Sequence, residues 1–159
     1  TNDQLWSMIP VDSDAKYGEA TGKQIRDWLE QELHNVFAKD PAKRFGGWVV
    51  RFKGMTANFT MHKEKGERVN WIKIGKKPID LSRTYLIAAC EREGDPADTL
   101  CRLEKVRNPR LANITMHTIL REYFGKFSPV APKVEGRITA TDAPQDLLSQ
   151  LEGYDYEFR

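Results

Sequence analysis

The stretch that decides the fold is YGEATGKQIRDWLEQELHNVF, residues 17–37. Residues 17–20 have the pattern of a short extended segment, and Thr21-Gly22 begins a helix. Apolar side chains then recur every three or four residues, namely Ile25, Trp28, Leu29, Leu33, Val36 and Phe37. The opposite, solvent-facing side is expected to carry Asp27, Glu30, Gln31 and Asn35. The pattern predicts an extended segment that leads into an amphipathic helix with one buried stripe.

After Gly46 the sequence changes to the period of strands. Runs rich in β-branched and aromatic residues alternate with glycine-containing turns. The uncharged apolar run Thr84–Cys90 is expected to be a central strand, and a charged loop and a long connection through Asn108-Pro109 follow it. Strands are predicted over residues 48–52, 55–61, 69–74, 84–90 and 136–140, with hairpin turns at 65–67 and 75–78.

Three further helical segments are expected. Thr1 caps a first turn, and a second amphipathic helix begins near Thr115 and ends at Gly125, before Ser128-Pro129. Asp142 is expected to cap a short helix with a proline in its first turn. The prediction is a single α+β domain over residues 1–159, in which two main helices pack on a mostly antiparallel sheet.

Composition narrows the possible partners. The 159 residues include 40% hydrophobic residues, which suffice for a core, and their net charge is +2. Such a near-neutral chain offers no basic stripe for phosphate contacts, so we expect no nucleic-acid partner. No run approaches the roughly 20 apolar residues of a membrane span, and we expect no membrane partner.

Residues with metal-binding or nucleophilic chemistry are dispersed. His34, His62 and His117 stand alone in the sequence, so we predict no metal site and no catalytic residue in this chain. His117 falls on the polar side of its helix and is expected at the surface. Trp28 and Trp71 are expected in the core.

The two cysteines leave two readings open. Cys90 and Cys101 lack the Cys-x-x-Cys spacing of redox and zinc motifs. In an oxidising compartment they could form a disulfide across a short loop, and otherwise they are buried thiols.

Several segments occur in an order that is typical of one family. They are residues 17–25 with Leu29-Glu30, Gly46-Gly47, 75–80, 84–88, 127–132 and 135–138. Together they resemble the 5'-nucleotidase C-terminal domain family over roughly residues 1–139. Within that family, Gly46-Gly47-x-x-Val50-Arg51-Phe52-x-Gly54 is most similar to the SoxB branch of sulfur oxidation.

The resemblance implies a longer enzyme. Members of the family carry an N-terminal metallophosphoesterase domain with two divalent metals of the Mn or Zn type, and a C-terminal domain that grips the substrate. The metal-ligand motifs of the former are absent from this chain. So is the family's Gly-Gly-x-Arg segment, which usually precedes the region of Thr1. The resemblance therefore implies an N-terminally truncated C-terminal domain of a periplasmic or secreted bacterial hydrolase, inactive by itself.

The resemblance also implies substrate-binding residues. The family holds a nucleotide base between two aromatic rings, and these positions correspond to Arg51 or Phe52 and to Arg92, with Asp95 matching an acidic loop residue. A guanidinium can stack but also needs an anion or carbonyl, so a small anionic substrate is favoured over adenine. Alternatively, Arg51 is an exposed residue without a partner, Phe52 is core, Arg92 pairs within its own loop and Asp95 caps a turn.

Two functions remain open at this point. The first is the specificity domain of a two-metal hydrolase that acts on phosphoesters or a related sulfur ester, with a small anionic or nucleotide-like substrate. The second is a stand-alone, non-catalytic binding or interaction module. Two-metal motifs in the reading frame upstream of Thr1 would decide for the first.

Overall fold

The structure is a computed structural model, and it describes residues 1–46, 49 and 51–143, apart from the side chain of Cys90. The chain forms two compact units. The first unit comprises Thr1–Leu29 and Ile79–Glu135, and the second comprises Glu30–Pro78 and the chain from Gly136 onward. Helices and strands occur in both, and the sheets are mostly antiparallel, so the predicted α+β class is confirmed.

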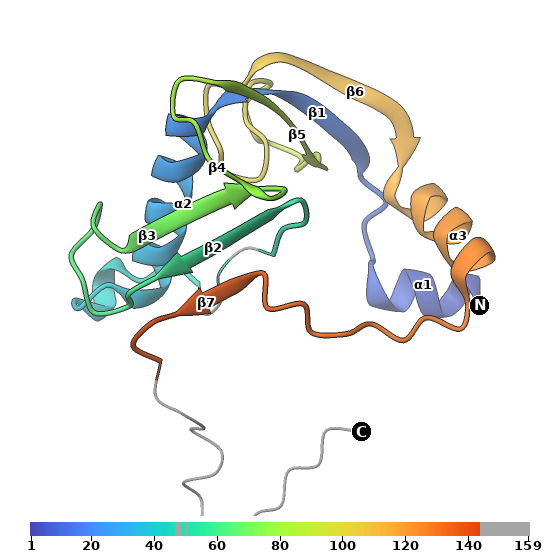
Figure 1. The fold of residues 1–159 in the computed structure, drawn as a ribbon. Helices are drawn as coiled ribbons and strands as arrows, with labels where there is room; N and C mark the ends of the chain where they lie inside the picture. The colour runs from blue at the N-terminus through green and yellow to red at the C-terminus, as the bar shows by residue number, and fades with distance from the viewer. Residues whose placement is uncertain (47–48, 50, 144–159) are drawn as a thin grey trace, which may run out of the picture. The chain divides into compact units, whose positions relative to one another are not determined.

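The first unit contains a three-stranded antiparallel sheet with strand order β5-β1-β6 (Figure 1). β1 (Asp14–Thr21) is the central strand, and β5 (Thr84–Cys90) pairs with it without a break in register. β6 (Arg107–Thr115) pairs with the other edge of β1 through two register shifts. The prediction that Thr84–Cys90 is central is therefore wrong. As an edge strand it exposes Leu86 by 73%, which an apolar run alone does not reveal.

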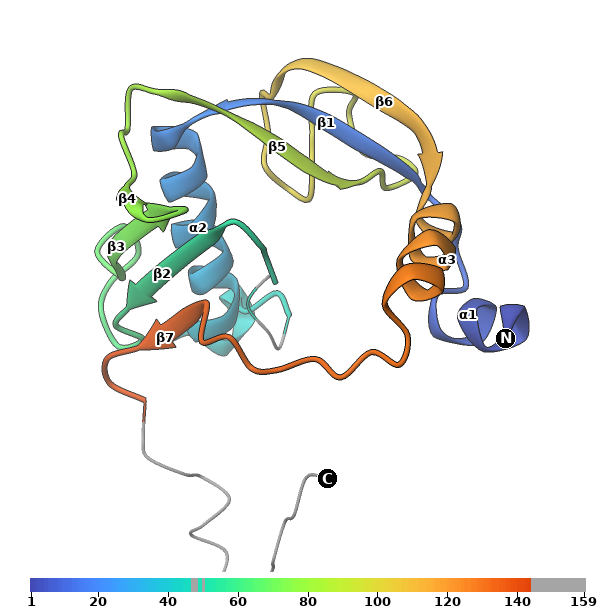
Figure 2. The ribbon, with the colours of Figure 1, turned by 45° about the vertical axis from the view of Figure 1, so that its right-hand side comes forward.

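Two helices of the first unit lie side by side in both ribbon views (Figure 2). α1 (Asn2–Met8) has a capping box between Thr1 and Gln4, as the sequence predicts for Thr1. α3 (Met116–Phe127) follows β6 directly. Its predicted end at Gly125 is two residues early, because one glycine inside a helix costs only about 1 kcal/mol relative to alanine.

His117 is fully buried at the start of α3, which corrects its predicted surface position. Its Nε2 lies 2.8 Å from the carbonyl oxygen of Ile9, and the Trp6 ring meets the imidazole edge-on, with ring centroids 4.2 Å apart. The backbone N–H of His117 donates to Asp12 Oδ1 at 2.8 Å, and this bond lowers the pKa of that carboxyl. The chain between α1 and β1 therefore covers the polar side of α3.

α2 (Gly22–Phe37) starts at once after β1, as predicted. The backbone N–H groups of Gly22 and Lys23 donate to the carbonyl oxygens of Arg83 and Leu81, both at 2.9 Å. A Cβ atom on Gly22 would lie 2.1 Å from the carbonyl oxygen of Asp80. Only glycine allows this close approach of two backbones.

The second unit has a four-stranded sheet of order β4-β3-β2-β7 (Figure 1). β2 (Met55–Phe59), β3 (Val69–Ile74) and β4 (Lys77–Pro78) are antiparallel, whereas β7 (Ile138–Ala140) runs parallel to β2. A short 3₁₀ helix spans Pro41–Lys43. Every second residue of β2 is buried, and the Phe59 and Phe37 rings pack with centroids 5.6 Å apart.

Several expectations for the second unit are wrong. Arg51 and Phe52 are not part of a strand, and the rest of the predicted strand includes residues outside the described ones. Trp71 was expected in the core, but it is 44% exposed on the outer face of β3, where Lys73 lies over its ring.

Asp142 connects the end of the second unit's sheet to the loop after β2. Its carboxylate accepts hydrogen bonds from the backbone N–H groups of Met61 and His62, at 2.7 and 3.0 Å. The helix expected after Asp142 lies outside the described residues.

Buried polar side chains organise the end of α2 in the second unit. Glu30, predicted on the solvent side, is buried, and its carboxylate accepts the backbone N–H groups of Val69 at 2.6 Å and Gly66 at 2.9 Å. Arg68 is also buried and donates to the carbonyl oxygens of Met61 and Phe37. These bonds fix the loop before β3 against the helix. In the described part of the chain, no helix is long and apolar enough to span a membrane.

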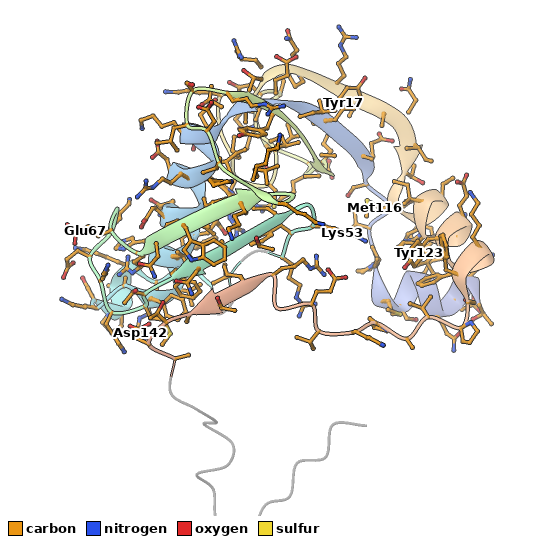
Figure 3. All side chains as sticks on the ribbon, viewed as in Figure 1. Tyr17, Lys53, Glu67, Met116, Tyr123 and Asp142 are labelled. Carbon is orange, nitrogen blue, oxygen red and sulfur yellow. The ribbon has the colours of Figure 1, made fainter. Side chains whose placement is uncertain are left out.

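Replacing Glu30 by alanine should destabilise the protein by roughly 2–3 kcal/mol, because two buried or half-buried N–H groups lose a charged acceptor. Glu67 is the matched control, since it lies exposed in the loop between β2 and β3 (Figure 3). Chemical denaturation of both variants measures the difference. Equal free energies of unfolding for Glu30→Ala and Glu67→Ala would contradict the role given to Glu30.

Candidate functional site

The loop that follows β5 contains two of the predicted site residues, Arg92 and Asp95. The backbone N–H of Asp95 donates to the carbonyl oxygen of Arg92 at 3.1 Å. Gly94 between them has a φ of 88°, a conformation that glycine adopts without strain. The loop therefore begins as a tight turn, with Arg92 exposed at its first position and Asp95 half-buried at its last.

Glu91 attaches this turn to the central strand of the first unit. Its backbone N–H donates to the carbonyl oxygen of Asp14 at 2.8 Å, and its Oε1 accepts a hydrogen bond from Lys16 Nζ at 3.3 Å. The Lys16 side chain is only 6% exposed, against 37% for Glu91. Lys16 was not among the predicted site residues. The sequence offers one indication of its burial: Lys16 lies on the same face of the strand as the small residues Gly18 and Ala20, because side chains two residues apart point to the same side.

The alternative in which Arg92 pairs within its own loop does not hold. The Glu91 carboxylate is engaged by Lys16, and among the residues that the structure describes Arg92 makes no ion pair or side-chain hydrogen bond. The Arg92 guanidinium is therefore available to a ligand.

Arg51 and Phe52 precede β2 in the second unit, next to Lys53 (Figure 3). Arg51 is exposed and has no ion pair with any described residue. Phe52 is half-buried, and its carbonyl oxygen accepts a hydrogen bond from the Arg137 guanidinium just before β7. This bond attaches the backbone of the segment to the sheet, and it does not involve the side chain of Arg51 or of Phe52.

The four predicted residues are divided equally between the two units. Arg92 and Asp95 belong to the first, and Arg51 and Phe52 to the second. The strands adjacent to them, β5 and β2, belong to different sheets, so the four residues do not follow neighbouring strands of one sheet. That all four line one pocket stays a prediction.

Another polar contact within the described residues joins His34 to the buried Arg68. His34 Nδ1 lies 3.4 Å from the Arg68 guanidinium, and burial, followed by the positive charges of Lys65 and Arg68, lowers the pKa of this histidine. Among the described residues, no three His, Cys, Asp or Glu side chains gather closely enough to hold a metal ion. Those residues do not fit the two-metal centre that the family resemblance implies. The Cys90 side chain lies outside the described residues, so its pairing with Cys101 stays a prediction.

Comparison with known proteins decides the family. Residues 1–91, more than half of the chain, match the sequence pattern of the 5'-nucleotidase C-terminal domain. The chain belongs to the 5'-nucleotidase C-terminal domain family. The recognition made from the ordered segments is thereby confirmed. Sequence similarity to relatives extends beyond residue 91, since one alignment covers 147 residues of the chain.

Relatives include both nucleotide and sulfur hydrolases. The trifunctional nucleotide phosphoesterase protein YfkN of Bacillus subtilis (strain 168) is 28% identical over 147 residues, which are 89% of this chain and 10% of YfkN. The sulfate thiohydrolase SoxB of Thermus thermophilus is 25% identical, with a TM-score of 0.65 over 86% of this chain and 24% of SoxB.

A similar fold occurs in a 5'-nucleotidase precursor from Thermus thermophilus. Its TM-score is 0.69 at 18% identity, over 89% of this chain and 28% of the precursor. The chain thus spans a tenth of its curated relative and about a quarter of these solved proteins.

The exposed Arg92 and the buried Arg68 should respond differently to truncation. Arg92→Ala should leave the free energy of unfolding unchanged, because no contact of its side chain is lost. Arg68→Ala should cost roughly 2–4 kcal/mol, because it leaves a cavity and two carbonyl groups without their donor. Urea denaturation compares the two, and a large loss of stability in Arg92→Ala would show that Arg92 serves the fold.

Proposed function

We propose that this chain is the substrate-binding part of a longer two-metal hydrolase that acts on phosphoesters or related sulfur esters. The observation that carries the proposal is the match of residues 1–91 to the 5'-nucleotidase C-terminal domain. The names of the relatives support the reaction class, since one is a nucleotide phosphoesterase and another a sulfate thiohydrolase. The chain's small share of each relative leaves room for a separate catalytic domain.

The proposed division of labour follows from the residues of the chain. When bound in the other domain, two divalent metal ions supply charge neutralisation and an activated water. The present chain contributes binding and orientation, which convert the reaction of a bound substrate into an effectively unimolecular step. Arg92 and Arg51 are the binding groups, and Phe52 and Asp95 complete the proposed contacts.

The substrate class follows from the two arginines. A guanidinium presents planar N–H donors that match carboxylate, phosphate and similar oxyanions in a bidentate manner. Because both arginines are exposed and without ion pairs among the described residues, both can engage an anion. Two aromatic rings would instead form a slot for a flat base. We therefore propose a small or highly anionic substrate in preference to adenosine monophosphate.

The isolated chain should show no hydrolase activity, because the described residues hold no cluster of metal ligands. Assays with Mn²⁺, Co²⁺ or Zn²⁺ against nucleotides and p-nitrophenyl phosphate measure this directly. The longer protein that contains the chain is the positive control and should turn over under the same conditions. Turnover by the isolated chain that survives repurification would contradict the division of labour.

In the longer protein, Arg92→Phe should improve the use of a nucleoside monophosphate relative to the native substrate. One restored base-stacking contact is worth roughly 1–2 kcal/mol in the ratio of kcat/KM values. Arg110→Phe is the matched control, since Arg110 is exposed on β6 of the same unit, outside the loop. An unchanged ratio in Arg92→Phe, or an equal change in the control, would refute the role of Arg92.

A further inference from the structure

Lys16 is buried in the first unit, on the central strand β1 of the sheet. Lys16 lies on the same face of β1 as the buried residues Gly18 and Ala20, and its cross-strand partners are Ala89 on β5 and Leu111 on β6. A buried ammonium group is costly unless a carboxylate and hydrogen bonds compensate it. Here the Lys16 ammonium group donates a hydrogen bond to the carboxylate of Glu91, which lies outside β1, directly after β5.

The partner of Lys16 is the residue directly before Arg92. Glu91 is held twice by β1, through its backbone N–H on the Asp14 carbonyl oxygen and through its carboxylate on Lys16. The turn closed by Asp95 begins immediately afterwards. The backbone at Arg92 is thus fixed on one side by Glu91 and on the other by the turn, although its own side chain is exposed.

We propose that Lys16 is a positioning residue that sets the direction of Arg92 toward an anionic substrate by holding Glu91. This inference rests on the proposed function, because it needs Arg92 to bind substrate. Lys16 itself is too deeply buried to reach a ligand, so it acts through the loop. The structure therefore assigns a role in specificity to Lys16 on β1, although the loop that it orients follows the neighbouring strand, β5.

The stability of a Lys16 variant distinguishes a positioning role from a purely structural one. Removing one partner of an ion pair is strongly destabilising where the other charge stays buried and unpaired, but much less so where that charge is exposed to water. Methionine has nearly the length of lysine and no charge, and the half-exposed Glu91 left behind can turn to water. Lys16→Met should therefore leave the melting temperature nearly unchanged while it frees the loop.

The experiment uses the longer protein with p-nitrophenyl phosphate as substrate and inorganic phosphate as inhibitor. In Lys16→Met the KM and the inhibition constant should rise by about fivefold while kcat stays within about twofold, the split expected when ground-state binding is lost. Lys23→Met is the matched control, since it removes a lysine that is also paired with a carboxylate, Asp27, on the exposed side of α2. It should change none of these values.

A double-mutant cycle with Arg92→Ala tests whether Lys16 acts through Arg92. If it does, Lys16→Met has little further effect on KM in the Arg92→Ala background, because coupled residues are not additive. A full additional effect in that background would overturn the positioning role. An unchanged KM in Lys16→Met alone, with a raised KM in Arg92→Ala, overturns the role of Lys16 and leaves the proposed function intact. A normal KM in Arg92→Ala overturns both.

Hydrogen exchange gives a readout that does not depend on activity. The amide of Glu91 is protected by its bond to Asp14, and peptides that cover residues 84–95 should exchange faster in Lys16→Met than in the parent protein or in Lys23→Met. Faster exchange restricted to this loop supports the proposal. Unchanged exchange there, or a general loss of protection with a lower melting temperature, contradicts it.

Discussion

The close approach of backbones at Gly22 is the constraint on which the rest of the structure depends. The central strand β1 ends there and α2 begins, while the chain at Asp80 passes within 2.1 Å of where a Cβ would lie. The N–H groups of Gly22 and Lys23 are bound to residues 81–83, just before β5. This contact sets where β5 starts along β1. The register of the sheet, and the place where the loop after β5 emerges, follow from it.

That register also explains how the loop after β5 is held on β1. β5 pairs with β1 from Thr84 to Cys90 without a bulge, so the next residue, Glu91, still meets Asp14 and Lys16. A loop tied in this way is pre-organised, and pre-organised groups lose less entropy when they bind. The exposed Arg92 therefore extends from a loop that is hydrogen-bonded to β1 at the preceding residue.

The sequence predicted the elements whose pattern is local, and missed properties that depend on packing. The helix after Thr21 and the hairpin at residues 69–78 were predicted, since periodicity and turn chemistry determine them. β6 was read as a connection because Pro109 and polar residues interrupt its pattern, which edge strands tolerate. Glu30 and His117 were misplaced because partners far away in the chain bury them. For the candidate site, a family pattern led to the prediction of the two arginines, which stays a prediction. Lys16 was not predicted, because its partner lies 75 residues away.

The central claim is that the exposed Arg92 in the loop after β5 binds an anionic substrate. A crystal structure of the longer protein with bound inorganic thiophosphate, a tetrahedral oxyanion, tests it most directly. We predict that the Arg92 guanidinium donates to the anion at about 3 Å. An anion bound by other residues, with the Arg92 guanidinium turned away from it, would contradict the claim.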